Sequence, residues 1–234
     1  MSLLANLFTC SNLICGFLSI IFSLEEHFTF SSWAIIFSVI FDGLDGQIAR
    51  RSSTVDHFGK EFDSLVDVIS FGIAPTILGY IFVYRHFHLS ATIALFIYLF
   101  CSVLRLAKYN IAPKENLLSH FYGLPTTVSG GTLASFILIY RRYTAKLPPP
   151  FIFLLLTLLL SFLMVSKVRY VNLYGIEAVL QKNKLFILGS ILVALIAVTV
   201  FYLITFVFLP ELIIFTLFIM YLLFSPFMVK SLST

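Results

Sequence analysis

The strongest constraint on the fold is a series of apolar stretches that recurs along the whole chain. Each is close to the ~20 residues that a helix needs to cross the hydrocarbon core of a bilayer. Eight such stretches cover residues 3–24, 28–49, 61–84, 89–109, 123–140, 149–166, 184–205 and 209–228. With 60% hydrophobic and 11% charged residues, the chain has too few polar residues to cover a globular surface in water. The sequence therefore predicts an all-α fold, a polytopic membrane bundle of eight transmembrane helices.

Basic residues are distributed unevenly between the two ends of these predicted helices. If the N-terminus is cytoplasmic, eleven of the 15 Lys and Arg residues fall on the cytoplasmic side, and the other four are Arg85, Arg141, Arg142 and Lys146. The positive-inside rule then predicts an integral protein of the inner, cytoplasmic cell membrane with both termini in the cytoplasm. The net charge of +4 is expected to face membrane lipids, and no basic domain of the kind that binds nucleic acid is present.

Four aspartates interrupt the second and third apolar stretches. Asp42 and Asp45 lie near the end of one predicted helix, and Asp63 and Asp67 lie near the start of the next. Steps of three and four residues keep each pair on one helix face, and an antiparallel arrangement puts Asp42 level with Asp67 and Asp45 level with Asp63. Ionised carboxylates in apolar surroundings are costly, so such residues indicate a functional site.

Divalent cations would satisfy all four carboxylates at once. An oxygen-only ligand set, with no nearby Cys or His cluster, favours Mg²⁺ or Mn²⁺ over zinc. Two ions about 4 Å apart would form a two-metal site for displacement at phosphorus. Gly46, Ala49 and Gly59 would let a nucleotide approach the backbone, and Arg50 would meet phosphate oxygens at the cytoplasmic mouth.

The segment from Asp42 to Asp67 resembles the signature of the CDP-alcohol phosphatidyltransferase family, membrane enzymes that transfer a phosphatidyl or phosphoalcohol group from a CDP-activated donor. Flanking segments resemble the integral-membrane members that use serine: NLFT at 6–9, NLICGF at 12–17, FGKEFD at 58–63, SLVDVISFGIAP at 64–75, RLAKYN at 105–110, GLP at 123–125 and FLMVS at 162–166. The resemblance implies a six-helix core in residues 1–170. It does not cover the C-terminal extension, residues 171–234, which holds the last two predicted helices and whose role stays open.

The resemblance also implies a role for each residue of the signature. Asp42, Asp45 and Asp63 would bind one divalent cation, and Asp42, Asp63 and Asp67 a second, with Asp67 also the base for the incoming hydroxyl. The CDP-bearing donor would be held by the set Asp45, Gly46, Ala49, Arg50 and Gly59.

For the acceptor, the resemblance implies L-serine, with CDP-diacylglycerol as donor and phosphatidylserine and CMP as products. Arg105, Lys108 and Asn110 are the candidates for binding serine or the donor phosphate, and Arg105 can grip a carboxylate bidentately. Related enzymes also imply a homodimer.

Other functions stay open at this point. The same chemistry with glycerol 3-phosphate or inositol phosphate is the first alternative, although a dianionic acceptor calls for more basic residues than the RLAKYN segment supplies. A carboxylate-lined cation transporter would not need Gly46, Ala49, Gly59 and Arg50 around its acids, and a lipid-binding scaffold would not need four unpaired carboxylates.

Overall fold

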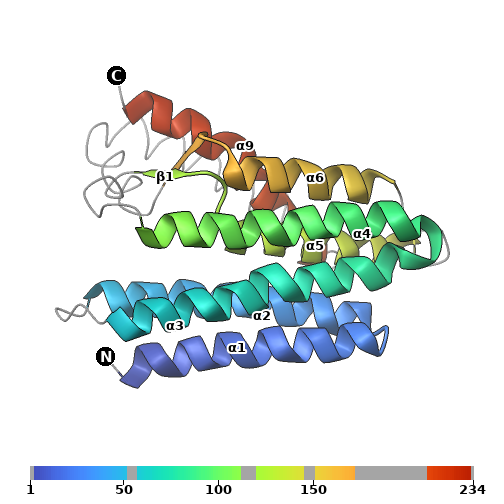
Figure 1. Ribbon diagram of the computed structural model, residues 1–234, viewed down its shortest axis with the longest axis horizontal. Helices are drawn as coiled ribbons and strands as arrows, with labels where there is room; N and C mark the ends of the chain where they lie inside the picture. Colours follow the sequence, from blue (N-terminus) through green and yellow to red (C-terminus); the bar gives the residue numbers. More distant parts are fainter. Residues whose placement is uncertain (1–2, 52–56, 112–119, 145–150, 172–209, 233–234) are drawn as a thin grey trace.

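The protein is a bundle of long helices with one very small sheet. The structure, a computed structural model, describes residues 3–51, 57–111, 120–144, 151–171 and 210–232 (Figure 1). The described elements are α1 (Leu3–Leu24), α2 (Phe28–Arg51), α3 (His57–Asp67), the π-helix η1 (Val68–Ile73), α4 (Ala74–Ile111), β1 (His120–Tyr122), α5 (Thr126–Thr144), α6 (Ile152–Val165), β2 (Arg169–Val171) and α9 (Pro210–Leu232). The predicted all-α class is confirmed.

Within the described residues, four helices are long and apolar enough to cross a membrane. They span Asn6–Leu24, Phe28–Ile48, Phe58–Tyr84 and His86–Ile111, and two shorter apolar helices span Ile152–Val165 and Glu211–Pro226. The 14 residues of α6 rise about 21 Å, which is less than the ~30 Å of a hydrocarbon core. The predicted stretch 184–205 lies outside the described residues. The structure therefore supports a membrane protein, while the count of eight spans stays a prediction.

The third and fourth predicted helices are almost continuous in the chain and form an antiparallel helical hairpin. α3 runs into η1 and then into α4, whose helical geometry breaks at Phe87 (φ −137°, ψ 44°). The break separates two antiparallel halves, as the two separate apolar stretches predicted. Figure 1 shows α1 and α2 beside α3, while α6 and α9 lie on the other side of the second half of α4.

Small polar side chains hold α1 against α2 at the end where the two helices meet. Ser31 Oγ lies 2.9 Å from Ser19 Oγ and 2.7 Å from Ser23 Oγ, and all three side chains are buried. Small residues let helices approach closely in an apolar medium, where packing rather than water exclusion drives association. Glu26, in the left-handed region at φ 59°, makes the tight turn between the two helices.

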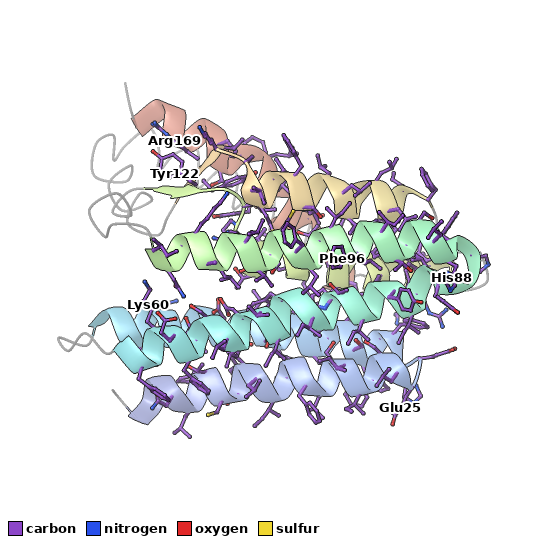
Figure 2. All side chains as sticks on the ribbon, in the orientation of Figure 1. Glu25, Lys60, His88, Phe96, Tyr122 and Arg169 are labelled. Carbon is purple, nitrogen blue, oxygen red and sulfur yellow. The ribbon has the colours of Figure 1, made fainter. Side chains whose placement is uncertain are left out.

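The two ends of the bundle differ in what they carry. Lys60, Tyr122 and Arg169 lie at one end, where α3 and β1 begin, and Glu25 and His88 lie at the other (Figure 2). We call the first the Lys60 end. Of the described basic residues, Lys60 and Arg169 at this end are two that the positive-inside rule assigned to the same side of the membrane.

A two-stranded antiparallel sheet, which the sequence did not reveal, closes part of the Lys60 end. β1 pairs with β2 in the register Phe121 to Tyr170 and Tyr122 to Arg169. Gly123 follows β1 at φ +79°, and a Cβ added there would overlap the carbonyl oxygen of Met164. Its N–H donates to Val168 O at 2.8 Å, so the backbone from 120 to 124 lies directly on the end of α6. This packing explains the glycine of the GLP segment.

We predict that Gly123→Ala lowers the thermal unfolding temperature of the protein in detergent. The left-handed backbone alone would cost about 1–2 kcal/mol with a Cβ present, and the overlap with Met164 O adds to it. Gly43→Ala is the matched control, because no atom lies within 4 Å of its added Cβ and Ala favours a helix by roughly 0.5–1 kcal/mol. Equal melting temperatures for the two variants would contradict the assigned backbone packing.

Candidate active site

The four aspartates meet where α2 and α3 pass each other near the Lys60 end. α2 supplies Asp42 and Asp45, and α3 supplies Asp63 and, as its last residue, Asp67. Carboxylate oxygens of Asp42, Asp63 and Asp67 all lie within 4.8 Å of one another. Asp45 and Asp67 are buried, with 4% and 9% of their surface exposed. The structure thus brings all the predicted acidic residues into one cluster.

The contacts within the cluster go beyond the two pairs expected from the antiparallel register. Asp67 shares a hydrogen bond with Asp42, as the spacing predicted. Asp63 lies with both of them, and Asp45 is near Asp63 and Asp42. Since all four groups are acids, mutual repulsion opposes their ionisation unless positive charge is supplied.

The cluster fits a bound cation by a direct structural test. Asp45 Oδ2, Asp63 Oδ1 and Asp67 Oδ1 are buried and have no hydrogen-bond partner among the described residues. An unpaired buried carboxylate oxygen is costly, and coordination to a hard cation removes that cost. The residues present therefore fit a hard divalent cation.

Helix α1 contributes a contact that the sequence reasoning missed. The Thr9 side chain, only 3% exposed, hydrogen-bonds to the Asp45 carboxylate. One turn earlier, Asn6 Oδ1 is buried and has no partner among the described residues. The available signal was the three-residue spacing of these two polar side chains, which sets both on one face of α1.

The π-helix η1 begins directly after Asp67. A π turn adds a residue to the helix and shifts the helix face that follows, and such turns are frequent at functional sites. Tyr98 on α4 donates a hydrogen bond of 3.0 Å to Phe71 O inside η1, and Ser70 Oγ donates to Asn12 O at 3.2 Å. These contacts from α4 and α1 support the irregular turn, so Asp63 and Asp67 face α2 while Ser70 faces α1.

The predicted donor-binding residues lie around the cluster on the same two helices. Gly46 follows Asp45 on α2, and Gly59 precedes Asp63 by one turn on α3; both are half-buried. The backbone places Ala49 and Arg50 in the last turn of α2, and their side chains lie outside the described part of the structure.

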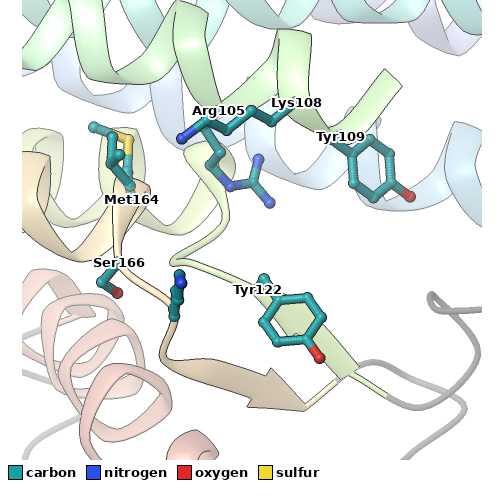
Figure 3. Close-up of a pocket in the computed structure, with 8 residues that line it drawn as sticks. Arg105, Lys108, Tyr109, Tyr122, Met164 and Ser166 are labelled. Atoms are coloured by element: carbon teal, nitrogen blue, oxygen red, sulfur yellow. The ribbon is translucent and has the colours of Figure 1, made fainter. Parts of the chain in front are cut away.

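A basic cavity opens beside the cluster at the Lys60 end. Its volume is about 430 Å³, and Figure 3 shows side chains from the end of α4, from β1 and from the end of α6 around it. Its lining residues are Arg105, Lys108, Tyr109, Tyr122, Met164, Val165, Ser166 and Lys167. Arg105 and Lys108 were predicted site residues. Tyr122, Ser166 and Lys167 were not, because strand pairing between distant segments brings them together.

Arg105 connects the cavity with the aspartates. Its side chain is 9% exposed, its Nη1 donates to Thr126 Oγ1 at 3.3 Å, and its charge interacts with Asp67 and Asp42. Asn110, the third candidate for acceptor binding, is hydrogen-bonded to α3. Its Nδ2 donates to Ser64 Oγ at 2.9 Å, and its backbone carbonyl accepts from Lys60 Nζ at 3.2 Å. In the structure Asn110 therefore ties the end of α4 to α3 and does not line the cavity.

Comparison with known proteins identifies the family. Residues 2–166 match the family model described as CDP-alcohol phosphatidyltransferase. The chain therefore belongs to the CDP-alcohol phosphatidyltransferase family, and the prediction of an enzyme of this family is confirmed.

Several curated relatives are similar over most of the chain. A CDP-diacylglycerol–serine O-phosphatidyltransferase of Helicobacter pylori is 35% identical over 202 residues, covering 84% of this chain and 82% of its own length. An archaetidylserine synthase of Methanothermobacter thermautotrophicus is 34% identical, covering 75% of this chain and 72% of its own. A CDP-diacylglycerol–serine O-phosphatidyltransferase of Bacillus subtilis is 33% identical, covering 73% and 90%. The predicted resemblance to serine-using members is confirmed.

The Thr9 contact leads to a prediction about metal affinity. Thr9→Val keeps the side-chain shape but removes the hydrogen bond that orients Asp45, and loss of a partner that orients a ligand typically weakens metal binding by about 10-fold or more. We expect the Mn²⁺ concentration for half-maximal activity to rise by a similar factor. Thr92→Val is the control, because Thr92 is exposed on α4 and bonds only its own helix at His88 O. An unchanged metal requirement in Thr9→Val would exclude this role.

Proposed function

We propose that the protein transfers a phosphatidyl group from CDP-diacylglycerol to L-serine, giving phosphatidylserine and CMP. The observation that carries the proposal is the aspartate cluster lying directly beside a cavity whose buried cation is Arg105. The cluster suits chemistry at a diphosphate, and the cavity suits an acceptor with a negative group. The names of the similar Helicobacter and Bacillus proteins support serine as that acceptor.

In this proposal the four carboxylates hold two divalent cations, Mg²⁺ or Mn²⁺. Asp42, Asp45 and Asp63 would bind one, and Asp42, Asp63 and Asp67 the other. When bound, the cations supply positive charge to the donor diphosphate and to the departing CMP. The unpaired buried oxygens of Asp45, Asp63 and Asp67 support this assignment.

The chain's own residues would carry out the remaining steps. Gly46, Ala49 and Gly59 leave room for the CDP part of the donor beside the α2 and α3 backbones, and Arg50 pairs with its phosphate oxygens. The serine hydroxyl oxygen forms a bond to the phosphorus that carries diacylglycerol, and Asp67 accepts the proton of that hydroxyl. The bond from that phosphorus to CMP breaks in the same displacement.

The acceptor would enter through the basic cavity. Arg105 lies between the cavity and Asp67, so a carboxylate held by its guanidinium leaves the serine hydroxyl directed toward the base. Lys108 would take part at the exposed rim. Asn110, first proposed as a third contact, would act from outside the cavity by fixing the end of α4 on α3.

The arrangement in the membrane belongs to the same proposal. The Lys60 end would face the cytoplasm together with both termini, the eight predicted helices would span the inner membrane, and the enzyme would be a homodimer. The clustering of Lys60, Lys108, Lys167 and Arg169 at one end supports this orientation.

A CMP-release assay in detergent with CDP-diacylglycerol and a panel of acceptors tests the proposal. L-Serine is expected to support rapid release, whereas glycerol 3-phosphate and inositol phosphate are not. Faster release with glycerol 3-phosphate would favour the alternative acceptor class. Metal-dependent ion uptake into vesicles without CMP release would instead favour a cation transporter.

We predict that Asp42→Asn, Asp45→Asn, Asp63→Asn and Asp67→Asn each remove almost all transfer activity. Each variant deletes a carboxylate charge at nearly constant shape, so the protein should still fold. EDTA should abolish CMP release by the wild-type protein, and Mg²⁺ or Mn²⁺ should restore it. Full activity after exhaustive chelation, or near wild-type turnover of a variant in saturating metal, would contradict the assigned role.

We also predict that Arg105→Lys raises the KM for serine more than it lowers kcat. Lysine keeps the charge but cannot bind a carboxylate through two parallel hydrogen bonds. Arg142→Lys is the matched control, since Arg142 is exposed at the end of α5, away from the cavity. A parallel change in both variants, or an unchanged serine KM in Arg105→Lys, would remove Arg105 from the acceptor site.

A further inference from the structure

One residue of α1 is hydrogen-bonded to both of the segments that adjoin the aspartates. Asn12 is fully buried, and Ser38 Oγ of α2 donates a hydrogen bond to its side-chain oxygen Oδ1. The same hydroxyl lies 3.3 Å from the Asn12 backbone oxygen. From η1, Ser70 Oγ donates to that backbone oxygen at 3.2 Å. We call Asn12, Ser38 and Ser70 the Asn12 junction.

The Asn12 junction lies about one helical turn from the aspartate cluster on both segments. Ser38 precedes Asp42 by four residues on α2, so their side chains lie on one face of that helix. A step of four residues along a helix is about 6 Å. Ser70 follows Asp67 by three residues, within η1. The junction therefore sets the spacing between α2 and η1 close to Asp42 and Asp67.

The backbones of α1 and η1 are in direct contact beside the junction. Gly16 lies one turn after Asn12 on α1, and a Cβ added there would lie 2.9 Å from Ser70 Cα and would overlap Ser70 Oγ. Because no side chain of α1 separates the two segments at this point, η1 cannot move toward α1. The hydrogen bonds of the junction oppose movement of η1 or α2 away from it.

The Asn12 side chain is not the one that packing alone would favour. Its Nδ2 is buried and has no hydrogen-bond partner among the described residues. A buried amide donor without a partner destabilises a protein, and an apolar side chain would not carry this cost. An unsatisfied buried group of this kind calls for an explanation other than packing.

The aspartates need a restraint on the spacing of their backbones. Ionised carboxylates repel one another, and that repulsion acts to separate α2 from α3. A cation such as Mg²⁺ binds oxygen ligands at about 2.0–2.1 Å in near-octahedral geometry, which tolerates little displacement. Asp side chains are short, so the distance between the two backbones decides whether carboxylates from both helices reach one ion. The oxygens of Asp42, Asp63 and Asp67 already lie within 4.8 Å of one another.

We propose that Asn12 is a positioning residue for the metal site: it holds α2 and η1 at the spacing at which Asp42 and Asp67 bind the same cation. The inference rests on the proposed function, in which the four carboxylates bind two divalent cations. Breaking the junction is expected to weaken metal binding. At saturating metal, the acceptor KM should not change, because the basic cavity is lined by other elements.

The test measures Mn²⁺ binding to Asn12→Ala, Ser38→Ala and Ser70→Ala in the full-length protein in detergent. The readout is the rise in melting temperature as Mn²⁺ is added, which requires no substrate. We expect the Mn²⁺ concentration at half of the maximal rise to increase by up to about tenfold, the low end of what loss of groups that orient metal ligands costs. The double variant of Asn12 and Ser38 should show no further increase, since both substitutions break the same hydrogen bond.

Ser31→Ala is the matched control. Ser31 Oγ lies 2.9 Å from Ser19 Oγ and 2.7 Å from Ser23 Oγ, so its loss removes buried hydroxyl contacts between the same two helices, α1 and α2. Ser31 lies about three turns before Asp42 on α2. We expect this variant to lower the melting temperature without metal and to keep the wild-type half-saturating Mn²⁺ concentration.

The outcomes separate a positioning role from a packing role. If the junction variants lose stability but keep the wild-type half-saturating concentration, the inference is overturned, and the same follows if Ser31→Ala raises that concentration equally. If Mn²⁺ does not stabilise the wild-type protein, the metal site of the proposed function fails and the inference fails with it. If the Mn²⁺ results are as expected but serine supports no CMP release, only the proposed acceptor is wrong.

Discussion

The crowding of four carboxylates in an apolar bundle is the constraint on which the rest of the structure depends. Such groups repel one another and lose their hydration, so the bundle must provide compensation from several directions. Thr9 supplies a hydrogen bond from α1, and Arg105 supplies a positive charge from α4. Asp45, Asp63 and Asp67 each keep an oxygen that has no partner among the described residues and that a divalent cation would coordinate. Two further helices, α1 and α4, thus converge on short segments of α2 and α3.

The π-helix η1 after Asp67 lets Asp63 and Asp67 face α2 while the residues that follow pack in the bundle. In a regular α-helix running from α3 into α4, the angle about the helix axis between the face that carries Asp63 and Asp67 and the face that packs in the bundle would be fixed. The π turn changes that relation, and Tyr98 and Ser70 stabilise it through bonds to Phe71 O and Asn12 O. The glycine that follows, Gly72, lies against Ser102, so α4 folds back closely on the same turn. The positions of the aspartates therefore depend on the packing around η1 in the middle of the bundle.

Much of this arrangement could be predicted from local sequence, and the remainder could not for a physical reason. Helix positions follow from apolar length, and the meeting of Asp42 with Asp67 follows from antiparallel helices and a fixed rise per residue. The cavity depends instead on β1 pairing with β2, two three-residue strands that are separated in the sequence by the 46 residues from 123 to 168. Nothing in either strand's own sequence specifies its partner. The same limit explains why Asn110 was assigned to the acceptor, since its bond to Ser64 is a contact between helices.

Arg105 connects the aspartate cluster with the basic cavity. It is attracted to Asp67 and Asp42 on one side and lines the cavity on the other, so in the proposed function it would lie between the metal ligands and the acceptor. Its guanidinium is also held by Thr126 at the start of α5, to which Nη1 donates a hydrogen bond of 3.3 Å. Behind β2, the Tyr221 ring of α9 stacks on Tyr170. A helix that follows the family's matched segment, residues 2–166, therefore packs against β2, the strand that follows the cavity-lining residues Ser166 and Lys167.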